Sequence, residues 1–85
     1  MNELSMRGVV QIKNVSGAPY AVEELDGHVL QDQETVDLLD DSLPVHYDDH
    51  TSANRLVTEL DSAKLRQDIQ SGDIEVVLNT APLLT

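Results

Sequence analysis

The chain has 85 residues and a formal net charge of −11, from 16 acidic and 5 basic residues. It contains no Phe, Trp or Cys, so its core must be aliphatic, and neither disulfides nor thiolate metal sites can stabilise it. This length fits one domain over residues 1–85, with an N-terminal arm at 1–7, a globular core at 8–79 and a C-terminal tail at 80–85. Small domains without such reinforcement often gain stability by associating, so we expect partner chains.

The acidic balance also excludes classes of partner. Nucleic-acid binding depends on Lys and Arg side chains that neutralise phosphates, and an anionic membrane surface would repel this chain for the same reason. No stretch approaches the roughly 20 apolar residues of a membrane span, and Met1–Met6 lacks the pattern of a signal peptide. We therefore expect no nucleic-acid or membrane partner. The negative charge serves solubility, or it complements a basic partner surface.

The first half of the chain predicts short antiparallel strands. Gly8–Val15 is rich in β-branched residues, and a second strand is expected over Tyr20–Leu25. Asp26-Gly27 then predicts a tight hairpin turn with positive φ at both residues, and His28–Leu30 returns antiparallel.

The middle of the chain is less regular. A further strand is expected over Glu34–Leu39, with Val36 and Leu38 pointing inward. Val45–Ser52 is polar and is expected to form a surface loop. Arg55–Leu60 fits a helix about as well as a short strand, so the sequence leaves this segment open.

The clearest helical pattern covers Ser62–Ser71. Asp61 is a suitable N-cap for this helix, and Gly72 can end it in the left-handed conformation. A last strand is expected over Asp73–Asn79. Its expected inner-face residues are Ile74, Val76 and Leu78.

Together these patterns predict an α+β fold. We expect a small, mainly-β domain of four to five short antiparallel strands with one packed helix at about 61–72 and flexible terminal arms. A domain of this length buries only about 60–65% of its unfolded surface. It can therefore build a compact platform, and its surface and its ends are left to carry a function.

One cluster contains potential metal ligands. His46 and His50 are four residues apart, and with Asp48 or Asp49 they could hold a divalent transition metal if they shared a helix face. Pro44 and the polar surroundings favour a solvated loop instead. Acid pairs elsewhere would need a deep pocket that separates two carboxyl pKa values in catalysis, and so short a chain has little room to build one. We expect neither an enzyme nor a bound cofactor or metal.

The two ends of the chain supply the interface candidates. These apolar residues are Leu4, Met6, Pro82, Leu83 and Leu84. Such groups at a chain end can dock on a neighbouring protein, or they can fold back on their own core. Two arms on a small acidic body suit a subunit of a larger assembly.

Four short stretches carry a resemblance to a known family. They are Val10–Gly17 (VQIKNVSG, with an Asn-x-Ser turn), Glu24–Gly27 (ELDG), Thr35–Leu38 (TVDL) and Leu65–Val76 (LRQDIQSGDIEV). Their order, which covers most of residues 9–77, resembles small virion structural proteins of tailed bacteriophages, of the neck, head-surface or fibre-attachment type. Gln31–Gln33 departs from the Pro-Gly or similar turn that this family tends to place before the Asp-Leu strand.

The resemblance implies a structural subunit of a virion that is assembled in the host cytoplasm. Its partners would be other virion proteins and copies of itself, and it would need no cofactor. The residues alone leave an alternative, a small acidic intracellular binding or inhibitory protein that masks a basic partner surface. Both interpretations place the function in contacts between proteins.

Overall fold

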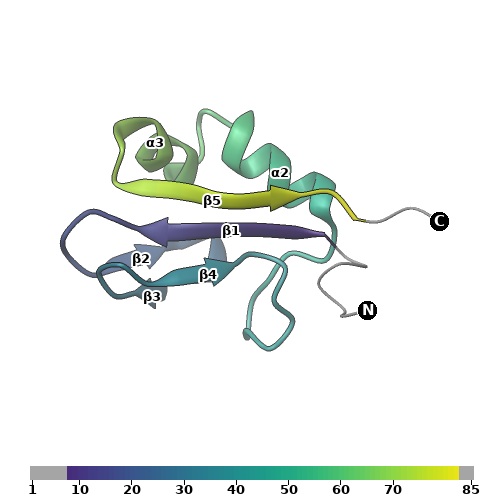
Figure 1. Ribbon diagram of the computed structural model, residues 1–85, viewed down its shortest axis with the longest axis horizontal. Helices are drawn as coiled ribbons and strands as arrows, with labels where there is room; N and C mark the ends of the chain where they lie inside the picture. The colour runs from purple at the N-terminus through teal and green to yellow at the C-terminus, as the bar shows by residue number, and fades with distance from the viewer. Residues whose placement is uncertain (1–7, 83–85) are drawn as a thin grey trace.

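The computed structural model describes residues 8–82 and contains five strands and two α-helices in this part of the chain (Figure 1). The elements in chain order are β1 (Val9–Asn14), β2 (Tyr20–Val22), the 3-10 turn η1 (Glu23–Leu25), β3 (His28–Leu30), β4 (Thr35–Asp37), α2 (His50–Thr58), α3 (Lys64–Ser71) and β5 (Ile74–Thr80). One antiparallel sheet has the order β4–β1–β5, and the hairpin β2–β3 forms the other. The predicted small α+β domain is confirmed.

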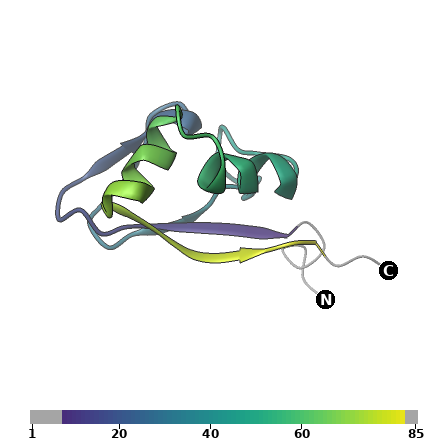
Figure 2. The same cartoon turned by 90° about the horizontal axis from the view of Figure 1, so that it is seen from above.

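The central strand β1 separates two faces of the larger sheet. Val10, Ile12 and Asn14 are fully buried on one face, whereas Gln11 and Lys13 are partly exposed on the other. Figure 2 shows α2 and α3 on one side of β1 and β5, so these helices cover the face of the buried residues. We call the opposite side of this sheet the outer face.

The core lies between the covered face of the sheet, the hairpin and the helices, and it is aliphatic as the composition requires. Its buried members are Val10, Ile12, Val22, Leu25, Leu30, Val36, Leu38, Leu39, Ala53, Leu56, Val57, Leu65 and Ile74. Full burial of one Val, Leu or Ile side chain stabilises a fold by about 1.5–3 kcal/mol. Tyr20 and Tyr47 pack against this cluster and are only partly buried, so neither ring lies at the centre of the core.

The first hairpin is longer than predicted. β2 ends at Val22, and η1 replaces the strand that was expected to continue to Leu25. Asp26 (φ 57°) and Gly27 (φ 79°) take the predicted positive φ, but they end a five-residue loop rather than form a two-residue turn. Val22 and Leu25 are both buried, and a straight strand would place residues three apart on opposite faces. The 3-10 turn allows both to reach the core.

The segment that the sequence left open is the second half of a helix. α2 begins at His50, so the surface loop predicted over Val45–Ser52 ends at Asp49. The Asp49 carboxylate accepts a hydrogen bond from the Ser52 N–H at 3.2 Å and caps the helix. Ala53, Leu56 and Val57 form the buried stripe of α2.

The helix α3 begins at Lys64, two residues later than predicted, and Asp61 is not its cap. An acid from another element takes that role. Glu24 in η1 accepts a hydrogen bond from the Leu65 N–H at 3.1 Å. Because Glu24 lies far away in the sequence, a local pattern could not indicate it. Gly72 (φ 94°) ends the helix in the left-handed conformation, as predicted.

Candidate protein-interaction surface

The edge strand β5 contains a bulge. Val76 lies opposite the buried Ile12 of β1. The next paired residue, Leu78, lies opposite Gln11 of the outer face. Val77 is therefore an extra residue, and the register between the two strands shifts at this point.

The bulge leaves two consecutive apolar side chains exposed in the edge strand. Val77 is the unpaired residue of the bulge, whereas Leu78 shares the outer face with its partner Gln11. Their exposed fractions are 40% and 45%. The prediction that Leu78 faces inward is wrong, because it assumed an uninterrupted strand. Asn79 instead points towards α2.

The exposed and partly exposed side chains around the bulge form a patch that we call the outer patch. Its members are Gln11, Lys13, Glu75, Val77, Leu78 and Thr80. Lys13 lies directly opposite Glu75 on the neighbouring strand, so the two charges of the patch compensate each other. An apolar patch bordered by polar groups is the surface pattern of a contact site.

The rest of the described surface has an excess of acidic groups. Every helical cation of residues 8–82 already has an acidic partner. The pairs are Arg55–Glu59 at 3.1 Å, Lys64–Asp68 at 2.7 Å and Arg66–Asp61 at 3.3 Å. The exposed carboxylates of Glu23, Asp26 and Asp73 form no ion pair with a described residue. This surface therefore attracts cationic groups and repels anionic ones.

The structure does not bring the predicted histidine cluster together. His46 Nδ1 lies 3.4 Å from Asp48 Oδ1. His50 Nε2 donates a hydrogen bond to Asn79 Oδ1 at 2.7 Å, an assignment that follows from the amide oxygen as acceptor. Asp49 is engaged as the cap of α2. Within residues 8–82, no three potential His, Cys, Asp or Glu ligands lie close enough together to hold a metal ion.

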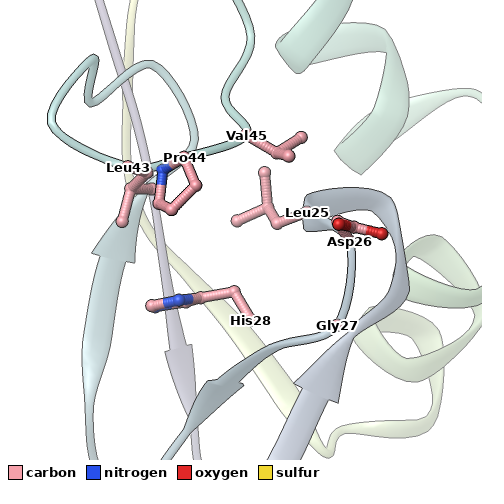
Figure 3. A pocket seen from close by; sticks show the side chains of 7 residues that line it. All are labelled: Leu25, Asp26, Gly27, His28, Leu43, Pro44 and Val45. Atoms are coloured by element: carbon pink, nitrogen blue, oxygen red, sulfur yellow. The ribbon is translucent and has the colours of Figure 1, made fainter.

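A shallow pocket lies between the hairpin loop and the segment 43–45 (Figure 3). Its lining residues are Leu25, Asp26, Gly27, His28, Leu43, Pro44 and Val45, and its volume is about 200 Å³. Sites for small molecules and cofactors usually measure about 300–1,000 Å³. This pocket therefore has room for a group the size of an amino-acid side chain.

A polar cluster joins the hairpin to α3. The Tyr20 hydroxyl donates a hydrogen bond to Asp68 Oδ2 at 2.5 Å. Lys64 Nζ donates to the same oxygen at 2.7 Å and lies 4.8 Å from the centre of the Tyr20 ring. Tyr20 and Asp68 are 48 residues apart, so no local sequence signal could have revealed this contact.

The contacts of this cluster shift three pKa values. Burial and the hydrogen bond to Asp68 raise the pKa of Tyr20 far above its ordinary value. The hydrogen bond to Asp68 also raises the pKa of Lys64. Burial alone would raise the pKa of Asp68, but the hydrogen bonds from Lys64 and Tyr20 outweigh it and lower this pKa. All three groups therefore keep one protonation state around neutral pH, which suits a structural tie.

Only one of the predicted interface residues lies in the described part of the chain. The four outside it are Leu4, Met6, Leu83 and Leu84. Pro82 is partly buried and lies close to Gly8, where an added Cβ would come within 3.0 Å of the proline ring. β5 extends one residue beyond the predicted strand, to Thr80, so the first tail residue belongs to the sheet.

No protein-family model matches the chain, and neither a curated protein nor a solved structure matches it. Within the part of the chain that the structure describes, no helix is long and apolar enough to cross a membrane. The resemblance to virion proteins stays a prediction, and the argument for a function rests on the geometry of the outer patch and on charge.

Proposed function

We propose that this chain is a structural subunit of a tailed-phage virion, at the neck, the head surface or a fibre attachment, and that it acts by binding neighbouring proteins. The observation that carries the proposal is the bulge that leaves Val77 and Leu78 exposed next to each other in the edge strand β5. A domain with so small a core has few apolar side chains, and here two of the larger ones contribute little to it. Contact with a neighbouring protein would remove these two side chains from water, which favours association.

The other features of the described surface fit binding better than catalysis. The pocket of about 200 Å³ is small for a substrate. Tyr20 and Lys64 stay protonated and Asp68 stays ionised around neutral pH, whereas an acid or base that exchanges protons needs a pKa near the working pH. We therefore propose no catalytic step and no cofactor.

The assembly context of the proposal comes from the resemblance and from charge. A virion subunit made in the host cytoplasm meets several neighbours at once, including other virion proteins and copies of itself. The unpaired acids of the surface suit contact with basic patches on those neighbours. The same acids oppose binding to nucleic acid or to an anionic membrane.

Analysis of purified particles tests this proposal. Mass spectrometry of gradient-purified particles from the bacterium that carries the gene should detect the chain. We expect Leu78→Lys to lower incorporation by about tenfold, since loss of about 1.4 kcal/mol of contact energy has that effect. Val29→Lys is the matched control, because Val29 on β3 is 46% exposed against 45% for Leu78. Absence of the chain from particles, or equal incorporation of both variants, would contradict the proposal.

A truncation tests the contribution of the C-terminal tail separately. The deletion should begin at residue 83, because removal of Thr80 and Pro82 would also disturb β5 and the contact with Gly8. If the tail docks on a neighbour, incorporation falls while the circular dichroism spectrum and the melting temperature stay unchanged. Unchanged incorporation would exclude tail docking and leave the outer patch as the contact.

The excess of unpaired acids favours one second candidate, a small protein that masks a basic surface on its target. Its binding would weaken steeply as salt screens the charges, and it would be insensitive to Leu78→Lys. Affinity purification of the full chain at low and high salt separates the two candidates. A single basic target that is lost at high salt would favour the masking role.

A further inference from the structure

We infer that the outer patch binds the outer patch of a second copy of this chain, so that two sheets pack face to face in a two-fold symmetric dimer. This inference rests on the proposed function, which makes the outer patch a contact surface, and it names the partner. Face-to-face packing of sheets is a common way to bury one side of an antiparallel sheet.

Charge is the first argument for a second copy. Two chains with a net charge of −11 repel each other over most of their surfaces. The outer patch is different, because Lys13 and Glu75 compensate each other and the other members are uncharged. A basic partner would be drawn to the acidic surface elsewhere, whereas this near-neutral area is where another copy meets the least repulsion.

The second argument is that the patch complements itself. A two-fold contact brings identical surfaces together, so each group must suit the group that the rotation places over it. A two-fold axis that runs between β1 and β5, parallel to both strands, places Lys13 of one copy over Glu75 of the other. The same rotation places Gln11 over Leu78. Neither ion faces a like charge in this arrangement.

Edge-to-edge pairing of two β5 strands would be the alternative route to a dimer. The bulge at Val77 breaks the regular spacing of backbone groups along the free edge, and bulges commonly protect edges from such pairing. The bulge therefore weakens the edge as a binding site while it adds apolar area to the outer face. This combination favours contact through the face.

The size of the patch predicts a weak dimer. β5 has seven residues, so the patch is about 24 Å long at about 3.4 Å per residue and roughly 10 Å wide across two strands. Contact of two such areas buries roughly 500 Å², whereas stable complexes usually bury about 1,200–2,000 Å². We therefore expect dimers only at high protein concentration in solution. In an assembly that holds many copies close together, the same contact gains strength from its effective concentration.

NMR spectroscopy of the full chain over a dilution series tests the inference. Concentration-dependent shifts of backbone amides should concentrate at the outer patch, and sedimentation equilibrium should show a monomer–dimer equilibrium. Added salt should increase the dimer fraction, because it screens the repulsion between two acidic chains. Leu78→Lys should remove the dimer, whereas Val29→Lys should retain it.

A charge exchange makes the test specific for the two-fold contact. Lys13→Glu and Glu75→Lys should each lower the dimer fraction, because each single change places like charges over one another. The double variant restores opposite charges within each chain and across the dimer, so its dimer fraction should recover. Melting temperatures of all three variants separate an effect on folding from an effect on association.

Three results would overturn the inference. They are a monomer at the highest concentration and salt, shifts that cluster away from the outer patch, and a double variant that associates no better than the singles. The dimer and the proposed virion function can fail independently of each other. A monomeric chain that still enters particles in a Leu78-dependent way defeats only the dimer, whereas a dimer that is absent from particles defeats only the virion role.

Discussion

The strands β1 and β5 are neighbours of similar composition, yet the fold uses them differently. Both are rich in Val and Ile, as VVQIKN over Val9–Asn14 and IEVVLNT over Ile74–Thr80. β1 has a strand on each side and buries every second residue completely. β5 is an edge strand, and beyond Val76 all of its residues are exposed. Apolar content therefore indicates a strand, while its position in the sheet decides whether it serves the core or the surface.

The two asparagines near the ends of these strands show the same contrast. Asn14 is fully buried, and its Nδ2 donates hydrogen bonds to Ala18 O at 2.7 Å and Leu30 O at 3.0 Å. Its Oδ1 accepts from the backbone N–H and the hydroxyl of Ser16. Asn79 also has two side-chain partners, but it is exposed. Asn14 therefore joins the two sheets, whereas Asn79 lies exposed in the edge strand β5.

Replacement of these asparagines gives the largest expected difference. We expect Asn14→Ala to lower the free energy of unfolding by about 3 kcal/mol, because it removes the partner of the buried Leu30 carbonyl and of the partly buried Ser16 N–H. Asn79→Ala should cost at most about 0.5–1 kcal/mol, since water replaces its partners. Urea unfolding followed by circular dichroism measures both. Equal losses would mean that burial does not distinguish the two strands.

A pair of glycines tests the contact between β1 and the end of β5. Gly8 and Gly17 have nearly the same φ, 87° and 88°, so Ala at either position carries the same backbone strain. An added Cβ at Gly8 would also lie 2.8 Å from Thr80 O, whereas nothing lies within 4 Å at Gly17. We expect Gly17→Ala to cost about 1 kcal/mol and Gly8→Ala about 1–2 kcal/mol more. The difference between their urea midpoints measures the effect of the clash between the added Cβ and Thr80 O. Equal midpoints would show that this contact does not affect stability.

Local chemistry explains why much of the fold was predictable from the sequence. The stretches that carry the resemblance contain residues whose roles are structural. Asn14 joins the sheets, the Asp37 carboxylate accepts from the N–H groups of Val10 at 3.2 Å and Leu39 at 3.0 Å, and Gly72 ends α3. The predicted resemblance therefore rests largely on residues that hold this fold together.

The outer patch could not be predicted, because it depends on a register between distant segments. The alternation of Ile74, Val76 and Leu78 is regular in the sequence, and only pairing with β1 shows the extra residue. The cap of α3 by Glu24 is equally non-local. The start of α2 was missed for another reason, since the polar residues before Ala53 read as a loop although Asp49 was a suitable cap.

The smallest expected effect concerns alkaline pH and the polar cluster on the covered side of the sheet. The pKa of Tyr20 is raised by burial and by its hydrogen bond to Asp68, so the folded state keeps a proton that the unfolded state loses near pH 10. Stability from this group is complete below about pH 10 and declines as the pH rises further. We expect Tyr20→Phe to cost about 1 kcal/mol at neutral pH and to make the alkaline decline shallower.

Urea midpoints at about pH 8 and about pH 11 measure this change in slope. Tyr47→Phe is the comparison, because burial and the charge of Glu24 also raise the Tyr47 pKa; it should make the decline shallower without breaking a hydrogen bond to Asp68. A Tyr20→Phe variant that declines as steeply as the parent would show that the tie to α3 is not maintained in solution. Leu78→Lys should leave the alkaline slope of the monomer unchanged, because both tyrosines pack against the core whereas Leu78 lies on the outer face. Together, these slopes separate residues that hold the fold from residues that are free to bind.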